Sequence, residues 1–465
     1  MHKKIFAVLY GLIALVCCWV AFSSGYTISS LEKVGYCSSI ILFVYLYIDF
    51  KINKKFTYSA LFVIILYLFH FGQLVLLTFF SGSYEHIRIL LLLDTNHALY
   101  GFRIMTASLA ALCFGILWKS AGYINRKGNE KKYNVDWIKI SKRIIYATFF
   151  VKLALDVTTL FISLTAGGDV ARLFVNTFPN VLLFYGKISL LGFAILLVSL
   201  KYQPQKQKRL FFFIIGYILI MMLSGIRSEN VGYLAIFLFL YLQTRLKPLK
   251  VRQFILYGVY AFFGLTFIVV VGQFRNYTNK SFDSFSELTD ELLKQNVVLG
   301  LFDTCGDTGY TAHETLNAYL PKFGPSYGDA YYKGITAVIP NLLPSIIDFG
   351  AITESSSCPI KLQQSNVLNR DYLNIGGSFL AELYMNFGVW GGVVMCFIWG
   401  LFFGWVGKKS ALAFEQDNIY QLIFLIPIML ASIYWVRSYF GGGVREAVWD
   451  ILFGLLILKK MSRYA

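Results

Sequence analysis

The chain has 465 residues, of which 57% are hydrophobic and only 14% are charged. Soluble domains are nearer to about 45–50% apolar and about 25% charged, so the composition excludes a soluble globular enzyme, a disordered chain and a fibre. The 42 basic residues outnumber the 25 acidic ones and give a formal net charge of +17. In a polytopic membrane protein, the position of such a basic excess along the chain indicates how the spans are oriented.

Apolar stretches recur along most of the chain. A helix needs about 20 mostly apolar residues to cross the hydrocarbon layer of a bilayer. The pattern predicts an all-α bundle of about twelve transmembrane helices, over residues 5–22, 34–48, 58–80, 98–118, 140–164, 178–200, 210–224, 231–243, 254–272, 378–405, 419–436 and 444–458. The first stretch follows Lys3 and Lys4, but it is longer than the apolar part of a signal peptide, so we interpret it as an uncleaved anchor.

The basic residues alternate between the two sides of this predicted bundle. One set of alternate connections holds more than half of them, in the ranges 3–4, 51–55, 119–143, 201–209, 245–252, 408–409 and 459–463. The short connections between them each hold very few. Loops rich in Lys and Arg stay in the cytoplasm, so we expect both termini to be cytoplasmic.

One predicted outer connection is much longer than the others. Residues 273–377 separate nine spans in residues 1–272 from three spans in residues 378–465. A connection of this length is usually functional. Ser284-x-x-Glu287 and Thr311-x-x-Glu314 match the capping box that opens a helix, and Pro321 is expected to end the second helix. Residues 335–347 are apolar enough to lie on the membrane surface.

Four arginines are expected near the outer ends of late spans, namely Arg227, Arg275, Arg437 and Arg445. Because arginines are normally enriched on the cytoplasmic side of a membrane protein, four of them on the outer side need an explanation. Guanidinium groups bind phosphate bidentately and stay charged at any working pH, so a ring of them suits a lipid-linked diphosphate. The alternative to phosphate binding is that each arginine extends to the lipid head groups or pairs with a nearby acid, such as Glu229, Glu446 or Asp450.

Several residues on the same side are candidates for proton transfer. Glu446 and Asp450 share one helix face, and Glu382 lies near the outer start of the tenth span; these acids either hold the arginines or act as a base. His313 follows the predicted helix start at Thr311, where a helix N-terminus lowers the pKa of a histidine and keeps it neutral. The alternatives are a surface role for His313, or Asp303 and Asp307 as the base.

The spans themselves contain a few polar residues. Lys152 and Asp156 lie four residues apart and are expected to form an internal ion pair. Arg103 and Lys187 each need a partner or a wet cavity. His70 and Gln73 share a face of the third span and suit hydrogen bonds between helices.

Cys305 and Cys358 are the two cysteines of the long loop. They can form a disulfide if the outer side of the membrane is an oxidising compartment. The sequence has no phosphate-binding GxxxxGK[ST], no GxGxxG that opens a helix, no HExxH and no paired CxxC. It therefore supports neither a nucleotide motor nor a structural zinc site, and we expect no metal, no cofactor and no nucleic-acid partner.

Three stretches resemble a known family, the O-antigen and capsule repeat-unit polymerases of the Wzy type. Residues 223–229 (LSGIRSE) are similar to the family's Gly-x-Arg turn between two mid-chain spans. Residues 376–392 (GGSFLAELYMNFGVWGG) are similar to its exit from the long loop into a span. The third is the pair Arg437 and Arg445 around the glycines at 441–443. The similarity of topology covers nearly the whole chain.

The resemblance implies a GT-C-like bundle in the bacterial inner membrane with its long loop in the periplasm. It implies a glycosyltransferase that polymerises oligosaccharide repeat units carried on undecaprenyl diphosphate. An acceptor hydroxyl would attack the anomeric carbon of the donor, and the arginines would stabilise the departing diphosphate. The substrates and membrane lipids are the implied partners, with a chain-length regulator protein as a further one.

Two other functions stay open. The lipopolysaccharide ligases share this architecture and transfer a finished chain instead of extending it. A flippase or other transporter of lipid-linked oligosaccharides would need charges through the middle of the membrane and commonly has an inverted repeat. Only Arg103, Lys152, Asp156 and Lys187 are mid-span candidates, and no repeat is detectable.

Overall fold

The computed structural model describes residues 2–80, 93–120, 136–166, 180–224, 227–245, 297–336, 355–365 and 376–461, with a few isolated positions between them. These residues form helices and no strand. In chain order the elements are α1 (His2–Ser23), α2 (Ile28–Asn53), α3 (Tyr58–Phe80), α5 (Thr95–Ser120), α6 (Trp137–Ala166), α8 (Asn180–Ser199), η1 (Leu200–Tyr202), α9 (Pro204–Met222), α10 (Arg227–Thr244), α13 (Val297–Gly306), α14 (Thr308–Glu314), η2 (Thr315–Tyr319), α15 (Leu320–Phe323), α16 (Asp329–Thr336), α18 (Cys358–Gln364), α19 (Phe379–Glu415), α20 (Ile419–Trp435) and α21 (Phe440–Met461).

The long helices correspond to the spans expected from the sequence. Each predicted span matches one described helix, except residues 254–272, which lie outside the described residues. By length and composition, seven described helices are able to cross a membrane, and α20 is a shorter apolar helix. Charged side chains in the first turn of α10 and in the second and third turns of α21 lower the mean hydropathy of those two helices. The fold class, a polytopic membrane helix bundle, is confirmed.

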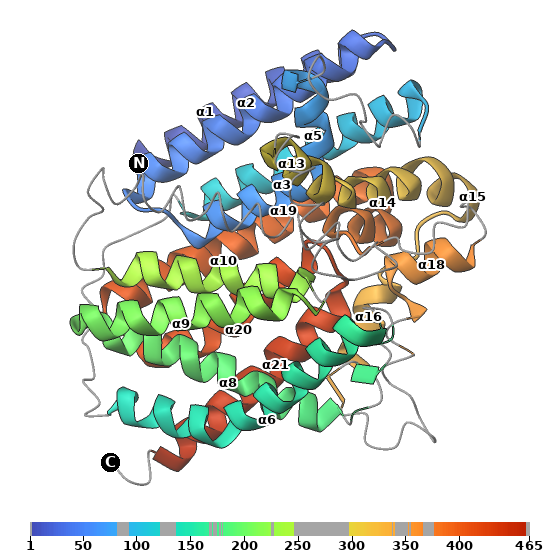
Figure 1. Ribbon diagram of the computed structural model, residues 1–465. Coiled ribbons are helices and arrows are strands. Elements are labelled where there is room, and N and C mark those ends of the chain that lie inside the picture. Colours follow the sequence, from blue (N-terminus) through green and yellow to red (C-terminus); the bar gives the residue numbers. More distant parts are fainter. Residues whose placement is uncertain are drawn as a thin grey trace.

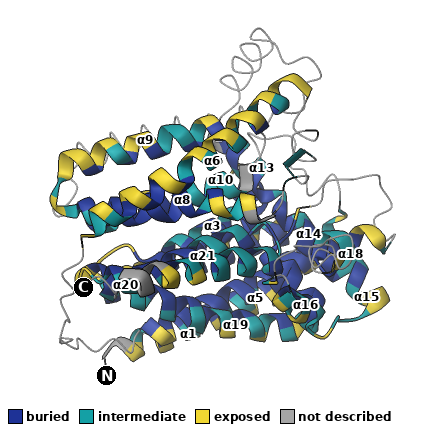
Figure 2. Ribbon diagram, turned by 90° about the horizontal axis from the view of Figure 1, so that it is seen from below, coloured by how far each residue is buried: buried dark blue, intermediate teal, exposed yellow. Residues whose placement is uncertain are grey.

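The helices form one bundle with its short helices at one end (Figure 1). We call this end, where α14, α15, α16 and α18 lie, the loop end. Helix α1 begins and α21 finishes at the opposite end (Figure 1). Helices α3 and α5 are mostly buried, whereas α6 and α9 expose one side (Figure 2).

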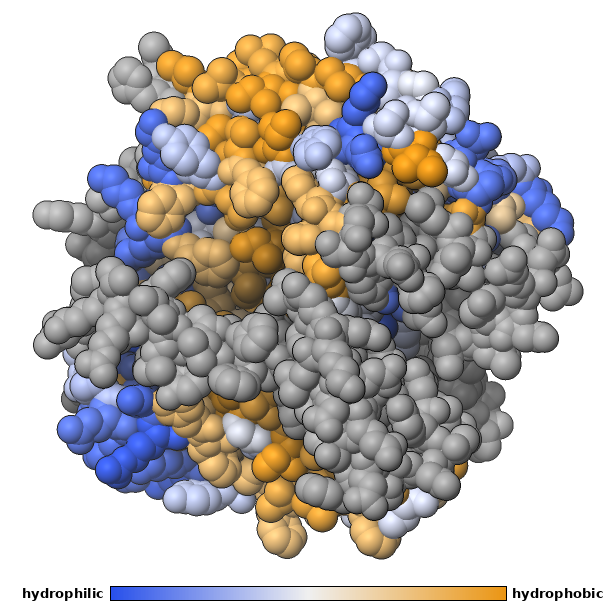
Figure 3. Space-filling view, turned by 45° about the horizontal axis from the view of Figure 1, so that its top comes forward, coloured by the Kyte–Doolittle hydropathy of each residue, from blue (hydrophilic) through white to orange (hydrophobic). Residues whose placement is uncertain are grey.

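The outer surface of the bundle is apolar, as a membrane requires. On the peripheral helix α6, Tyr146 is 80% exposed and Phe150 is 77% exposed. Figure 3 shows apolar side chains from the top to the bottom of the face, where grey atoms do not cover it, with hydrophilic side chains mainly at its left and right. This distribution is typical of a bundle whose middle is surrounded by lipid and whose ends are in contact with water.

Small residues allow the central helices to approach closely. A side chain added at Gly115 of α5 would meet the carbonyl oxygen of Phe397 in α19, and one at Gly400 would meet the carbonyl oxygen of Leu112. Lipid tails are as apolar as leucine, so helices in membranes associate through such close packing instead of hydrophobic burial. The pair α5–α19 therefore forms a tightly packed centre.

Helix α19 is folded back on itself at Gly388, where the sequence predicts one continuous span. Gly388 has φ 73° and ψ −178°, which lies outside helical geometry. The rings of Phe379 and Phe403 are 6.2 Å apart, although a straight helix would separate these positions by about 36 Å at 1.5 Å per residue. Residues 379–387 therefore form a short arm that runs antiparallel to the long arm, residues 389–415.

We expect Gly388→Ala to destabilise the protein by about 1–3 kcal/mol, because the backbone region that Gly388 occupies is essentially restricted to glycine. Thermal unfolding of the purified protein in detergent measures this change. Gly216→Ala in α9 is the matched control, because nothing lies within 4 Å of the added methyl group and alanine is the better helix former. Equal unfolding temperatures for the two variants would contradict the prediction.

The helices of the long loop differ in part from the sequence expectation. The capping box at Ser284 lies outside the described residues, as does most of the apolar segment 335–347. Within that segment Ile335 and Ile339 are exposed by 66% and 46%. Helix α16 is tied to α18 by Lys361, whose Nζ lies 2.8 Å from Asp329 Oδ2. Burial alone would raise the pKa of Asp329, but its lysine partners outweigh burial and lower it.

Candidate active site at the loop end

The four predicted arginines are placed unequally. Arg437 follows the end of α20, and its guanidinium lies 5.6 Å from the ring centre of Phe69 in α3. Arg445 lies in α21, and its guanidinium is 5.3 Å from the ring centre of Phe184 in α8. Arg227 is the first residue of α10, with its side chain outside the described part of the structure.

Arg275 also lies outside the described residues. Arg437 and Arg445 thus stack on aromatic rings from different helices. Both contacts are of the cation–π kind, which holds a guanidinium without neutralising its charge. A ring of four arginines stays a prediction.

A partly buried charge cluster joins three helices near Arg445. Lys187 of α8 forms an ion pair with Glu229 of α10 at 3.2 Å and a second, very close one with Glu446 of α21. The three side chains are only 21–26% exposed. Two of the acids that we considered as arginine partners are therefore held by a lysine.

Lys187 is the charged residue of this cluster for which the sequence suggested no partner. Its signal in the sequence is weak, because the two carboxylates that bind it are 42 and 259 positions away in the chain. The only clue is that α8, α10 and α21 each carry a charged side chain within their first seven or eight residues. Such residues are at the same level when the helices begin at the same end of a bundle.

A small cavity opens beside this cluster. It has a volume of about 10 Å³ and is lined by Lys187, Glu446, Asp450, Phe184 and Tyr233, with apolar residues of α8, α20 and α21. This volume is near the minimum that holds one water molecule, and the polar walls suit one. The Nε of neighbouring Arg445 is buried and forms no hydrogen bond among the described residues.

The predicted pair between Lys152 and Asp156 is confirmed and extends the cluster. Lys152 Nζ lies 2.7 Å from Asp156 Oδ2, and Tyr217 of α9 donates a hydrogen bond to the same carboxylate. The backbone of Lys152 packs against Gly186, which precedes Lys187. This pair is satisfied within the protein, and we interpret it as a link between α6, α8 and α9.

Glu382 connects the short arm of α19 to the turn between α20 and α21. Its Oε2 accepts hydrogen bonds from Trp435 Nε1 and, at 2.9 Å, from the backbone of Phe440. Its Oε1 is buried with no hydrogen bond among the described residues. Glu382 is 1% exposed. The geometry assigns it to the fixing of this turn, on which both Arg437 and Arg445 depend.

His313 lies in a different environment from the one expected. It is in the last turn of α14, is fully buried, and packs edge-on against Phe102 at 4.4 Å. Neither ring nitrogen forms a hydrogen bond within the described residues. Burial lowers the pKa of His313 to about 3, so the helix N-terminus is not the cause that the sequence suggested. A sealed ring of this kind presents no nitrogen to a substrate.

The predicted start of the His313 helix is also wrong. Thr311 lies inside α14, which begins at Thr308, and its hydroxyl donates to the carbonyl oxygen of Gly376 instead of capping a helix. The helical path continues through Pro321 to Phe323. A proline in the first turn of α15 is compatible with helix, so Pro321 does not end it.

Asp303 and Asp307 are both bound by one glutamine of α3. The Gln73 side-chain amide donates to Asp307 Oδ1 at 2.8 Å and to Asp303 Oδ1 at 3.3 Å. Nearby His70 donates from Nδ1 to the Leu66 carbonyl and accepts at Nε2 from the Ser378 hydroxyl at 2.8 Å. The expected role of His70 and Gln73 in joining helices is confirmed.

The optional disulfide between Cys305 and Cys358 is not present. Both are buried thiols, and Cys358 Sγ lies 3.5 Å from the hydroxyl of Thr315. The physical reason is that α13 packs against α3 whereas α18 packs against α19, so the two cysteines are held by different helices. Burial raises the pKa of the Cys358 thiol to about 12, which keeps it protonated and unreactive.

We therefore expect reducing agent to leave the gel mobility of the denatured protein unchanged. Alkylation under native conditions is expected to spare both cysteines, because neither thiol reaches the surface. The double variant Cys305→Ser/Cys358→Ser is the control. A mobility difference that disappears in this variant would show that the disulfide forms after all.

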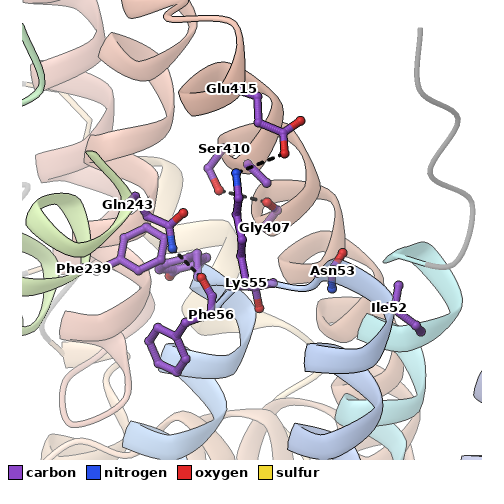
Figure 4. Close-up of a pocket in the computed structure, with 12 residues that line it drawn as sticks. Ile52, Asn53, Lys55, Phe56, Phe239, Gln243, Gly407, Ser410 and Glu415 are labelled. Carbon is purple, nitrogen blue, oxygen red and sulfur yellow. Dashed lines mark hydrogen bonds and ion pairs between the residues drawn. The ribbon is translucent and has the colours of Figure 1, made fainter. Parts of the chain in front are cut away.

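A second pocket lies near the start of α3 and has about 60 Å³ of space (Figure 4). Figure 4 shows Lys55 reaching Glu415, with the two groups 3.3 Å apart. This pair is exposed by 58% and 43%, and pairs so exposed contribute little. None of the predicted site residues lines the pocket.

Arg103, the other expected mid-span cation, is also accounted for structurally. Its guanidinium donates to the backbone carbonyls of Ala21, Ser24 and Gly25, and it lies 4.9 Å from the ring centre of Tyr26. It therefore fixes the connection between α1 and α2. The ion pairs of Lys187 with Glu229 and Glu446 lie instead at the junction of α8, α10 and α21.

The comparisons with known proteins agree with this architecture. A family model described as O-antigen polysaccharide polymerase Wzy matches residues 4–464, nearly the whole chain. No curated protein and no solved structure gives a significant match.

Proposed function

Because the chain belongs to the O-antigen polysaccharide polymerase Wzy family, we propose that it joins oligosaccharide repeat units carried on undecaprenyl diphosphate. The reaction takes place at the periplasmic face of the bacterial inner membrane. Both termini are cytoplasmic in this proposal, and residues 273–377 are periplasmic. The basic residues along the chain support this orientation.

The proposed chemistry is a glycosyl transfer without a metal ion. A hydroxyl of the incoming repeat unit attacks the anomeric carbon of the growing chain, and the lipid diphosphate of that chain leaves. Arg445, Arg437, Arg227 and Arg275 supply positive charge to the leaving diphosphate, in the manner of preorganised oxyanion stabilisation. The stacked guanidiniums of Arg437 and Arg445 support this role, because stacking leaves their charge available.

The family match over residues 4–464 carries the proposal. Two features of the structure favour surface chemistry over transport. Arg103 is bound by backbone carbonyls, and Lys152 is neutralised by Asp156, so the described mid-span charges do not form a path through the bundle. The family resemblance further suggests a chain-length regulator protein as a partner.

A deletion strain tests the proposed function, with surface polysaccharide separated on a gel and the gene restored as a control. Loss of the ladder with a single repeat unit retained on lipid A is expected for a polymerase. Loss of all capping would indicate a ligase. Accumulation of lipid-linked units on the inner face would indicate a flippase. An unchanged ladder would contradict all three.

A further inference from the structure

We infer that Asp450 is the base that receives the proton of the acceptor hydroxyl, an inference that rests on the proposed polymerase function. Glycosyl transfer needs a group to take this proton, and the sequence offers several acids and one histidine. The structure distinguishes them by what each already binds. Asp450 is the carboxylate that faces a cavity instead of a protein partner.

The other candidates are occupied or sealed. Glu229 and Glu446 are both bound to the Lys187 ammonium. The aspartates 303 and 307 share the Gln73 amide. Glu382 is 1% exposed and accepts hydrogen bonds from Trp435 and Phe440, and the ring of His313 is fully buried. A carboxylate held by an ammonium or an amide is a weaker and less accessible base.

Asp450 has a different setting. It lies one helical turn after Glu446 and lines the cavity together with Lys187 and Tyr233. Within the described part of the chain, no hydrogen bond or ion pair binds its carboxylate. The cavity has room for about one water molecule, which is also the size of a hydroxyl group. The Lys187 ammonium on the same wall holds Glu446 in place, so that Asp450 is the carboxylate left to accept a proton.

The cavity is adjacent to the diphosphate-binding arginine. Phe184 lines the cavity, and the guanidinium of Arg445 lies over the ring of this same residue. One aromatic side chain thus separates the proposed base from the proposed leaving-group cation. The long loop also reaches this place, because Trp449, next to Asp450, donates a hydrogen bond to the carbonyl oxygen of Val338.

The step is balanced with these groups alone. The acceptor O–H bond breaks and its proton passes to the Asp450 carboxylate. The acceptor oxygen forms a bond to the anomeric carbon of the donor. The bond between that carbon and the diphosphate oxygen breaks, and its electron pair leaves with the lipid diphosphate beside Arg445. Asp450 then returns the proton to water.

The test uses purified full-length protein in detergent and polyprenyl-diphosphate-linked repeat units. We expect Asp450→Asn to lower the polymerisation rate at saturating substrate by about 100-fold or more, the usual contribution of a general base, with substrate binding unchanged. Asp49→Asn is the matched control. Asp49 is a buried carboxylate at the other end of the bundle, where Thr57 and Asn53 donate to it, and it has no part in the reaction.

Chemical rescue separates a base from a merely structural residue. Asp450→Ala leaves space in the cavity, and added formate is expected to restore part of its rate in proportion to concentration. If Asp450→Asn does not fold, the same measurements on Asp450→Ala and Asp450→Glu test the inference. Retention of more than a tenth of the rate by Asp450→Asn, or absence of rescue in folded Asp450→Ala, would overturn the inference. Either result leaves the deletion experiment, and with it the polymerase function, untouched.

Discussion

Replacement of Arg445 by alanine is expected to abolish long glycan chains while single repeat units still reach lipid A. The guanidinium lies over the ring of Phe184, which lines the cavity, and its Nε has no hydrogen bond among the described residues. This N–H donor is thus available to the negative charge that develops on the leaving diphosphate during the reaction. Removal of one preorganised donor of this kind lowers a rate by about 100- to 1,000-fold. Arg227→Ala is expected to have the same effect.

The measurement is a surface-polysaccharide gel, combined with a determination of the amount of protein in the membrane fraction. Arg445→Lys is expected to remain defective, because lysine lacks the planar fork that binds phosphate bidentately. Arg245→Ala is a matched control, since Arg245 also stacks on an aromatic ring, that of Tyr241, but at the opposite end of the bundle. Long chains in both Arg445→Ala and Arg227→Ala would exclude the diphosphate-binding role.

The bundle was predictable from the sequence because lipid imposes a simple rule on it. A spanning segment must satisfy its own backbone hydrogen bonds and present apolar side chains, so that length and hydropathy suffice to find it. The reversal at Gly388 was not predictable in the same way. A glycine inside an apolar run is common in membrane helices, and only the proximity of Phe379 to Phe403 shows that the helix folds back.

The candidate site was predictable only in part, because pairing between helices depends on their arrangement. Lys152 and Asp156 are four residues apart, so helical periodicity alone places them together. Lys187 and Glu446 are on helices far apart in the chain, and no local rule joins them. His313 illustrates a different limit: its local sequence matches a helix start, but burial against α5 determines its chemistry.

The largest effect on stability is expected from Lys187→Met. This change leaves the partly buried carboxylates of Glu229 and Glu446 without their shared cation. Loss of one partner from a buried ion pair typically destabilises a protein by about 3–5 kcal/mol, because the remaining charge is neither hydrated nor compensated. Thermal unfolding in detergent is expected to show a lowered transition temperature, and the membrane fraction is expected to contain less protein.

Two comparisons identify the cause of that loss. Lys55→Met removes a lysine from an exposed ion pair with Glu415 and is expected to change stability by at most about 1 kcal/mol. The triple variant Lys187→Met/Glu229→Gln/Glu446→Gln removes all three charges and is expected to recover most of the stability, because a buried charge cluster is often replaceable by neutral groups. If Lys187→Met were as stable as Lys55→Met, the three helices would not depend on this lysine. Glu446→Gln alone should have the milder effect, since Lys187 keeps Glu229 as a partner.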